Sequence, residues 1–196
     1  MSKKNEVIAF FDRLSAGWDS HMVRNERAIN RIIDNGRVRE NMNVLDVACG
    51  TGVLIPDYLK RNVNSVTAID ISKGMTDIAA AKFADEEKVE VVCGDVMEYC
   101  PDKKFDCIVV YNALPHFESP EELIKKLAGL LETDGCLTIA HGMSFARLSR
   151  HHDNVSEDVS NPLTTAWELA DIMSRYLKVT VVVSDDEMYQ VAGVKE

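Results

Sequence analysis

Residues 44–52 read Val-Leu-Asp-Val-Ala-Cys-Gly-Thr-Gly, and this stretch decides the fold. An apolar run, interrupted by Asp46, leads into a turn in which Gly50 and Gly52 flank a threonine. This composition predicts a buried strand that enters a tight turn, and glycine lets a ligand approach closely because it has no Cβ. A loop for di- or triphosphates favours a lysine over a carboxylate. We therefore expect a ligand that is cationic or rich in hydroxyl and amine groups.

The composition is that of a globular protein without a polyanionic partner. The chain has 196 residues, 46% hydrophobic and 28% charged, with a net charge of −10. Nucleic-acid binding draws on clustered Lys and Arg, so we expect no nucleic-acid partner. There is no signal-like apolar segment near the N-terminus and no apolar run long enough to span a membrane. The five cysteines form no C-x-x-C pair, which disfavours zinc and disulfides and favours a cytoplasmic location.

Strand and helix patterns alternate from residue 44 to about residue 140, which predicts a parallel sheet with right-handed crossovers. The expected strands are Asn43–Val47, Ser65–Ile71, Val89–Val92, Phe105–Tyr111 and Gly135–Ala140, with helices at Val53–Arg61, from Ser72 to Lys82–Ala84, and at Pro120–Leu131. Helices are also expected at Val7–Leu14, Arg24–Ile33 and Leu163–Leu177, and the β-rich runs Val179–Ser184 and Met188–Val194 predict an antiparallel hairpin that ends the sheet.

Polar residues follow the expected strands at their carboxyl ends. Ligands of open parallel sheets bind at this edge, where the strand order reverses. Asp70 ends the second strand and can accept both hydroxyls of a ribose; its alternative role is to cap the next helix. Asp95 follows the third strand and can accept a hydrogen bond from an exocyclic amine such as that of adenine, or serve only as a turn residue. Asn112 follows the fourth strand and His141 the fifth.

Four motifs in this order resemble those of the class I S-adenosylmethionine-dependent methyltransferases, in particular the small-molecule branch that includes ubiquinone- and menaquinone-type enzymes. They begin at Asp46, Ala68, Cys93 and Phe105, the last continuing to Asn112-Ala-Leu-Pro-His-Phe. Residues 10–19 also resemble that branch's N-terminal segment, in which an aromatic residue followed by Asp closes over the cofactor. The resemblance implies a Rossmann-like, doubly wound α/β fold in three layers, with a mostly parallel seven-stranded sheet.

The resemblance also implies S-adenosylmethionine as cofactor and S-adenosylhomocysteine as product. Asp46 and the backbone of residues 48–52 would receive the methionine portion, Asp70 the ribose, and Asp95 and Val96 the edge of the adenine. Ala48 occupies the family's first glycine position, so a Cβ narrows the approach there. The full set of expected cofactor-binding residues is Trp18, Asp46, Ala48, Cys49, Gly50, Thr51, Gly52, Asp70, Ile71, Met75, Asp95, Val96 and Asn112.

The acceptor side offers histidines as candidates for a general base, because their pKa lies near neutral pH. His116 and His141 follow the fourth and fifth strands, and His151 and His152 lie in the connection after the fifth. His116 can instead shape the pocket without acid–base work, and a histidine metal site is a weaker alternative, so no metal is expected. Asn112-Ala-Leu-Pro differs from the motif typical of nucleic-base and glutamine methylation. We therefore expect a small organic acceptor.

These patterns predict a single methyltransferase domain in three parts: an N-terminal helical lid (1–40), a cofactor-binding core (41–142) and an acceptor-side connection with the C-terminal helix and hairpin (143–196). Three alternatives stay open at this point: another group transferase on the same scaffold, a non-catalytic S-adenosylmethionine-binding or regulatory protein, and, least favoured, a nicotinamide dehydrogenase, because the glycines lack the G-x-G-x-x-G order. The sequence does not decide whether the protein is a monomer or a homodimer.

Overall fold

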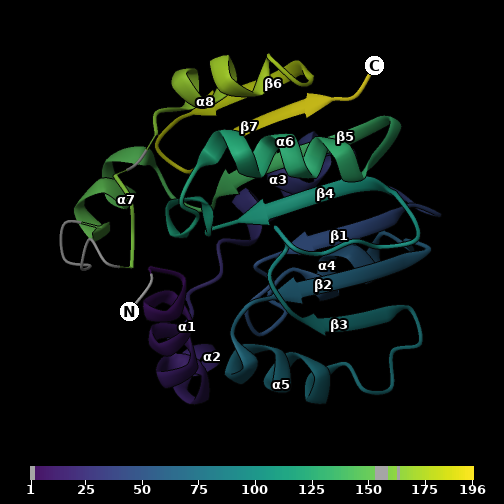
Figure 1. Ribbon diagram of the computed structural model, residues 1–196, viewed down its shortest axis with the longest axis vertical. Helices are drawn as coiled ribbons and strands as arrows, with labels where there is room; N and C mark the ends of the chain where they lie inside the picture. The colour runs from purple at the N-terminus through teal and green to yellow at the C-terminus, as the bar shows by residue number, and fades with distance from the viewer. Residues whose placement is uncertain (1–2, 153–158, 163) are drawn as a thin grey trace.

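The computed structural model describes residues 3–152, 159–162 and 164–196 (Figure 1). Its centre is one seven-stranded sheet in the order β3-β2-β1-β4-β5-β7-β6. The strands are β1 (Asn43–Val47), β2 (Ser65–Asp70), β3 (Val89–Cys93), β4 (Phe105–Tyr111), β5 (Leu131–His141), β6 (Lys178–Ser184) and β7 (Tyr189–Val194). The first five run parallel, and β7 runs antiparallel to both of its neighbours. The doubly wound, mostly parallel sheet expected from the sequence is confirmed.

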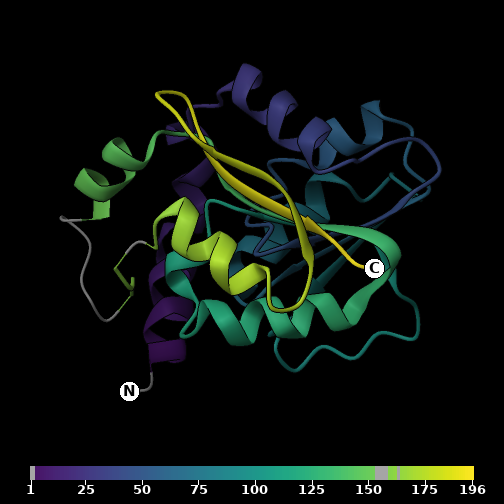
Figure 2. The same cartoon turned by 90° about the horizontal axis from the view of Figure 1, so that it is seen from above.

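Helices cover both faces of this sheet, which gives three layers. They are α1 (Lys3–Leu14), α2 (Trp18–His21), α3 (Glu26–Asn35), α4 (Ile55–Lys60), α5 (Lys73–Lys82), α6 (Pro120–Leu130), α7 (Phe145–His152) and α8 (Ala166–Met173), with 3-10 turns at Ser15–Gly17 and Leu114–His116. Seen from above in Figure 2, α3 lies on one side of the sheet and α6 and α8 on the other. Within the described ranges, no helix is both long and apolar enough to cross a bilayer.

Two apolar clusters fill the spaces between the layers. One joins α6 and α8 to the sheet through residues such as Leu127, Leu169 and Val110. The other joins α3 and α4 to the opposite face through Ile33 and Tyr58. Because β1 and β4 are covered on both faces, their residues are mostly apolar, with Asn43, Asp46 and Asp106 as the exceptions.

The strand order reverses between β1 and β4, since β2 and β3 lie to one side and β5 to the other. In Figure 1, α1, α2 and α7 lie beyond the arrowheads of the parallel strands. The N-terminal helices thus cover the edge of the sheet at which ligands bind in this architecture.

Several element boundaries differ from the sequence prediction. Helix α4 begins at Ile55 rather than at residue 53, because residues 51–54 form turns after the glycines. Strand β5 begins at Leu131, which is buried and lies opposite Phe105 in the ladder between β4 and β5, before an irregularity in the register. Helix α8 is shorter than expected, and Leu163, its expected start, lies outside the described residues. Helix α7 was not expected at all.

Candidate active site

A cavity of about 1250 Å³ lies at the carboxyl ends of the parallel strands, beneath the N-terminal helices. Its walls come from the glycine loop after β1, the ends of β2, β4 and β5, the turn after β3, and α1 and α2. Binding sites for one drug-sized molecule occupy roughly 300–1,000 Å³. The cavity therefore has room for two small molecules side by side.

The glycine loop exposes its backbone to this cavity at Gly50. A Cβ at Gly50 would meet no atom within 4 Å, and its φ is +55°. Gly52 has a different role, because a Cβ there would lie 2.6 Å from the Phe83 ring. Ala48 also has a positive φ, +54°, which an L-residue adopts at a cost. The loop is thus bent sharply at three positions, and Gly50 is the one that leaves room for a ligand.

Asp70 presents a fixed carboxylate to the cavity at the end of β2. One of its oxygens, Oδ2, accepts a hydrogen bond from the Gly50 amide at 2.8 Å. The other, Oδ1, accepts one from the Ser72 amide at 2.9 Å. The side chain is 9% exposed, and burial raises its pKa. Its remaining lone pairs suit a ligand that donates hydrogen bonds, such as a vicinal diol.

Asp46 lies below the loop, outside the residues that line the cavity. It sits within β1, with Ala68 on one side and Val109 on the other, and is 2% exposed. Among the described residues, its Oδ2 has no hydrogen-bond partner. Burial, and then the nearby Asp70 carboxylate, raise its pKa to about 8. Asp46 is therefore a buried acid outside the cavity lining whose protonated form is favoured.

An apolar wall with one acid lies at the ends of β2 and β3. Ile71, Met75 and Val96 line it and suit a flat ring. Asp95 stands at its edge and accepts a hydrogen bond from the Met97 amide at 2.8 Å through Oδ1. Its Oδ2 forms an ion pair with the Lys4 ammonium of α1 at 2.7 Å. Asp95 can thus accept a hydrogen bond from an amine, and in this structure the Lys4 ammonium occupies that position.

Two carboxylates fasten the N-terminal helices over the cavity. Asp12 accepts hydrogen bonds from the Ser72 hydroxyl at 2.6 Å and the Gly74 amide at 2.8 Å. Asp19 accepts one from the Thr51 hydroxyl at 2.5 Å and pairs with Lys82 at 2.8 Å. Thr51 therefore holds the lid and does not line the cavity.

Trp18 lines the cavity, as expected from the sequence. Its ring meets the edge of Phe11, with the ring centroids 5.7 Å apart. Phe11 meets the His116 ring in the same way at 4.9 Å. The lid therefore brings an aromatic surface against the segment that follows β4.

Two of the four candidate histidines line the cavity. His116 Nδ1 lies 2.9 Å from the Val159 carbonyl oxygen, and because a carbonyl only accepts, the proton of the neutral ring is on Nδ1. His141 ends β5, is buried, and meets the Tyr189 ring edge at 5.6 Å. His151 and His152 end α7, and their side chains lie outside the described part of the structure.

Asn112 lies between these histidines and the glycine loop, in a left-handed conformation with a φ of +56°. Its Oδ1 accepts a hydrogen bond from the Gly142 amide at 3.0 Å. A Cβ at Gly142 would lie 2.0 Å from the Tyr111 hydroxyl, so the phenol packs directly on the Gly142 backbone. Tyr111 lines the cavity and was missed, although an aromatic residue ending an apolar strand was a usable signal.

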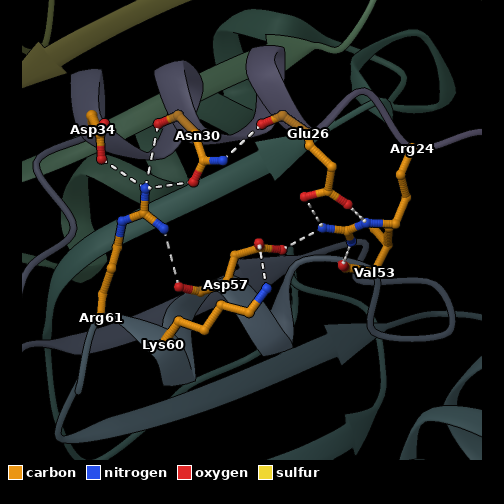
Figure 3. A network of polar contacts seen from close by, with 8 residues as sticks. All are labelled: Arg24, Glu26, Asn30, Asp34, Val53, Asp57, Lys60 and Arg61. Atoms are coloured by element: carbon orange, nitrogen blue, oxygen red, sulfur yellow. Dashed lines mark hydrogen bonds and ion pairs between the residues drawn. The ribbon is translucent and has the colours of Figure 1, made fainter.

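Arg24 is a second cavity residue that sequence reasoning missed, because its partners come from distant segments. Figure 3 shows its guanidinium between Glu26, Asp57 and the Val53 carbonyl. The distances are 2.7 Å to Glu26 and 2.7 Å to Asp57, whose side chain is 2% exposed. Arg24 thus fastens the chain segment after α2 to α4, the helix that follows the glycine loop.

The fold and the cavity together define a Rossmann-like protein with a cavity at the switch point of its sheet. Residues 44–135 match the family described as Methyltransferase domain. The solved structure "DhpI-SAH complex structure" has a TM-score of 0.78 at 16% identity and covers 97% of this chain and 96% of its own, which is a likeness of fold.

Two curated relatives agree with the family match. The malonyl-[acyl-carrier protein] O-methyltransferase of Acetivibrio thermocellus is 31% identical over 154 residues, covering 76% of this chain and 54% of its own length. The ubiquinone biosynthesis O-methyltransferase of Coxiella burnetii is 27% identical over 144 residues, covering 68% of this chain and 60% of its own length. The chain thus spans about half to three fifths of these relatives. These matches support the class I S-adenosylmethionine-dependent methyltransferase family that the motifs predict.

Proposed function

We propose that the protein transfers a methyl group from S-adenosylmethionine to a small organic acceptor. The observation that carries this proposal is the Asp70 carboxylate, held by the Gly50 and Ser72 amides and open to a cavity large enough for two ligands. The family match and the relatives named as O-methyltransferases support it and favour an oxygen nucleophile.

The cofactor residues divide the cavity by chemistry. Asp70 binds the ribose diol through its free lone pairs. Asp95 receives the adenine amine after Lys4 has moved aside, and Ile71, Met75 and Val96 pack on the ring. The backbone of Ala48, Cys49 and Gly50 receives the methionine portion, while Trp18 and Asn112 bound the cavity nearby; Asp46, Thr51 and Gly52 support this arrangement from outside the lining.

The acceptor binds in the rest of the cavity, against α1, Tyr111, His116 and His141. S-adenosylmethionine supplies a methyl group that its sulfonium already activates. The protein's task is then to align the acceptor oxygen for in-line attack, to exclude water, and to take the acceptor's proton where it has one. His116 suits the last task because its neutral tautomer has the lone pair on Nε2. His141, His151 and His152 remain further candidates for the base.

We also propose that residues 1–40 act as the lid, 41–142 as the cofactor core and 143–196 as the acceptor side of one domain.

The cysteines Cys49, Cys93, Cys100, Cys107 and Cys136 form no disulfide, which supports a cytoplasmic location. The net charge of −10 supports a small acceptor over nucleic acid. We also propose that the protein can form a homodimer, and light scattering would measure its mass in solution.

Calorimetry with S-adenosylmethionine and S-adenosylhomocysteine tests the cofactor assignment. Asp70→Ala should weaken binding by about 1–3 kcal/mol, because charge-assisted hydrogen bonds to the ribose are lost. Asp77→Ala is the matched control, since Asp77 lies on α5, pairs with the exposed Lys73 and does not line the cavity. Equal affinities for Asp70→Ala and the parent protein would remove Asp70 from the site.

Labelled cofactor incubated with cell extract tests the transfer. We expect label in a small organic product that mass spectrometry identifies. Tight cofactor binding without any labelled product would instead support the non-catalytic binding protein. A label on a group larger than methyl would support another transferase.

A further inference from the structure

Asp46 is a buried acid without a cationic partner, directly beneath the cofactor loop. It is 2% exposed, and its Oδ2 has no hydrogen-bond partner among the described residues. Two titratable groups act on its pKa: Asp70 at the end of β2 raises it, and the Tyr58 phenol of α4 lowers it. Asp12 of α1 in turn acts on Asp70 and raises the pKa of that acid. The negative charge of Asp46 also raises the pKa of the Cys49 thiol in the loop. Each of these groups is neutral or negative, and β4 faces Asp46 with the apolar Val109.

An ionised carboxylate is costly in such a place. Burying a charge without a partner costs several kcal/mol, and the group usually takes up a proton instead. A second carboxylate nearby adds repulsion, so the two acids titrate as a pair. Burial and Asp70 together raise the pKa of Asp46 to about 8. Without a ligand, the pair thus retains a proton at neutral pH.

A cationic ligand reverses this balance. Asp70 lines the cavity and holds the Gly50 amide, while Asp46 lies outside the lining on β1 and interacts electrostatically with Asp70. A positive charge over Gly50 therefore acts on both acids. The proposed cofactor has two such charges, its sulfonium and its ammonium, whereas its demethylated product lacks the sulfonium. Opposite charge favours the ionised form of a carboxylate, and more so where solvent is excluded.

We propose that Asp46 and Asp70 form a proton-holding pair that gives up its proton when S-adenosylmethionine binds, and that the pair thereby distinguishes the cationic cofactor from its uncharged-sulfur product. This inference rests on the proposed function. The carboxyl O–H bond breaks, the electron pair stays on the carboxylate, and the proton passes to the buffer. The affinity for the cofactor increases as the pH rises towards 8. The affinity for the product also increases, but depends less on pH.

Calorimetry in phosphate, HEPES and Tris at one pH measures the proton release, because the apparent enthalpy changes with the ionisation enthalpy of the buffer. With the unaltered protein at pH 7, we expect release approaching one proton for each S-adenosylmethionine bound, and less for S-adenosylhomocysteine. Between pH 6 and 7, below the pKa of about 7.7–8.0 of a free α-amino group, cofactor affinity should rise by up to about tenfold per pH unit.

Asp46→Asn removes the titrating group and keeps the shape. We expect this variant to bind the cofactor with little buffer-dependent heat and with an affinity nearly independent of pH. Asp77→Asn, an exposed acid paired with Lys73, should release as many protons as the parent. Should Asp46→Asn not fold, the contrast between cofactor and product in the unaltered protein still decides the matter.

The outcomes separate the two proposals. Absence of any binding heat with S-adenosylmethionine overturns the proposed function. Binding without buffer-dependent heat leaves that function standing and overturns the proton-holding pair. Undiminished proton release in Asp46→Asn, or equal release with cofactor and product, overturns it as well.

Discussion

Replacing Arg24 by Met tests whether the network of Figure 3 holds the segment after α2 in place. The guanidinium lies 2.7 Å from Asp57, with side-chain exposures of 25% and 2%. Among the described residues, its removal leaves the buried Asp57 carboxylate with the Lys60 ammonium, 3.9 Å away, as its remaining ion-pair partner. Breaking a buried pair costs about 3–5 kcal/mol. Because Lys60 remains and water can enter where Arg24 was partly exposed, we expect the lower end, about 3 kcal/mol.

Urea denaturation at pH 7 measures this loss, and a double-mutant cycle assigns it to the pair. Asp57→Asn removes the buried charge and keeps the side-chain shape. The double variant Arg24→Met, Asp57→Asn should be more stable than Arg24→Met alone, by about 1–2 kcal/mol, because no uncompensated carboxylate is left. Exposed Arg27, which pairs with Glu187, provides the control, and Arg27→Met should cost less than about 1 kcal/mol.

Two results would refute this reasoning. One is an Arg24→Met variant within about 1 kcal/mol of the parent, which would mean that the network contributes no more than surface pairs do. The other is additivity, with the double variant losing the sum of both single losses. In that case the two side chains stabilise the protein independently.

Three further predictions concern the turn after β5, the glycine loop and the lid, in that order. Gly142→Ala should lower stability by about 1–3 kcal/mol in thermal unfolding, because its Cβ meets the Tyr111 hydroxyl at 2.0 Å, and adding Tyr111→Phe should restore part of the loss. Gly52→Ala should cost more than Gly142→Ala in the same assay, since it combines a φ of +83° with a contact of 2.6 Å to Phe83. Hydrogen bonds donated to Asp12 hold its pKa below the usual 3.8, so its contribution is present above that pH and lost as the pH falls through the lowered pKa. Asp12→Asn should therefore melt below the parent from pH 5 to 8, with the two converging towards pH 3; a constant gap would contradict the role of this carboxylate.

The sequence predicted the strands well, because each combines an apolar run with a polar terminus. The ends of β1 and β4 agree with the structure to the residue. Helix α7 was missed because its sequence, Phe-Ala-Arg-Leu-Ser-Arg-His-His, has few apolar positions to reveal a periodicity. Boundaries shifted at α4, which begins only after the turns of residues 51–54, and at β5, which begins at Leu131 before an irregularity in its register with β4.

The candidate site was predictable where function depends on local sequence. Asp70 and Gly50 follow from strand ends and turn chemistry, and both line the cavity. Arg24 was missed because its place depends on packing between distant segments, whereas Tyr111 was missed although it ends an apolar strand. The burial of Asp46 below the lining was equally invisible, since an acid within an apolar strand can face either way.

The position of β7 has a consequence for how the protein is made. This strand comes last in the sheet by sequence, yet it lies between β5 and β6, with all six of its residues buried. During synthesis, β5 and β6 emerge from the ribosome with no partner between them. Until residues 189–194 have been added, β5 is paired with β4 along one edge only and the valine-rich β6 lacks its partner. Chaperones have their main opportunity to bind the nascent chain in that interval.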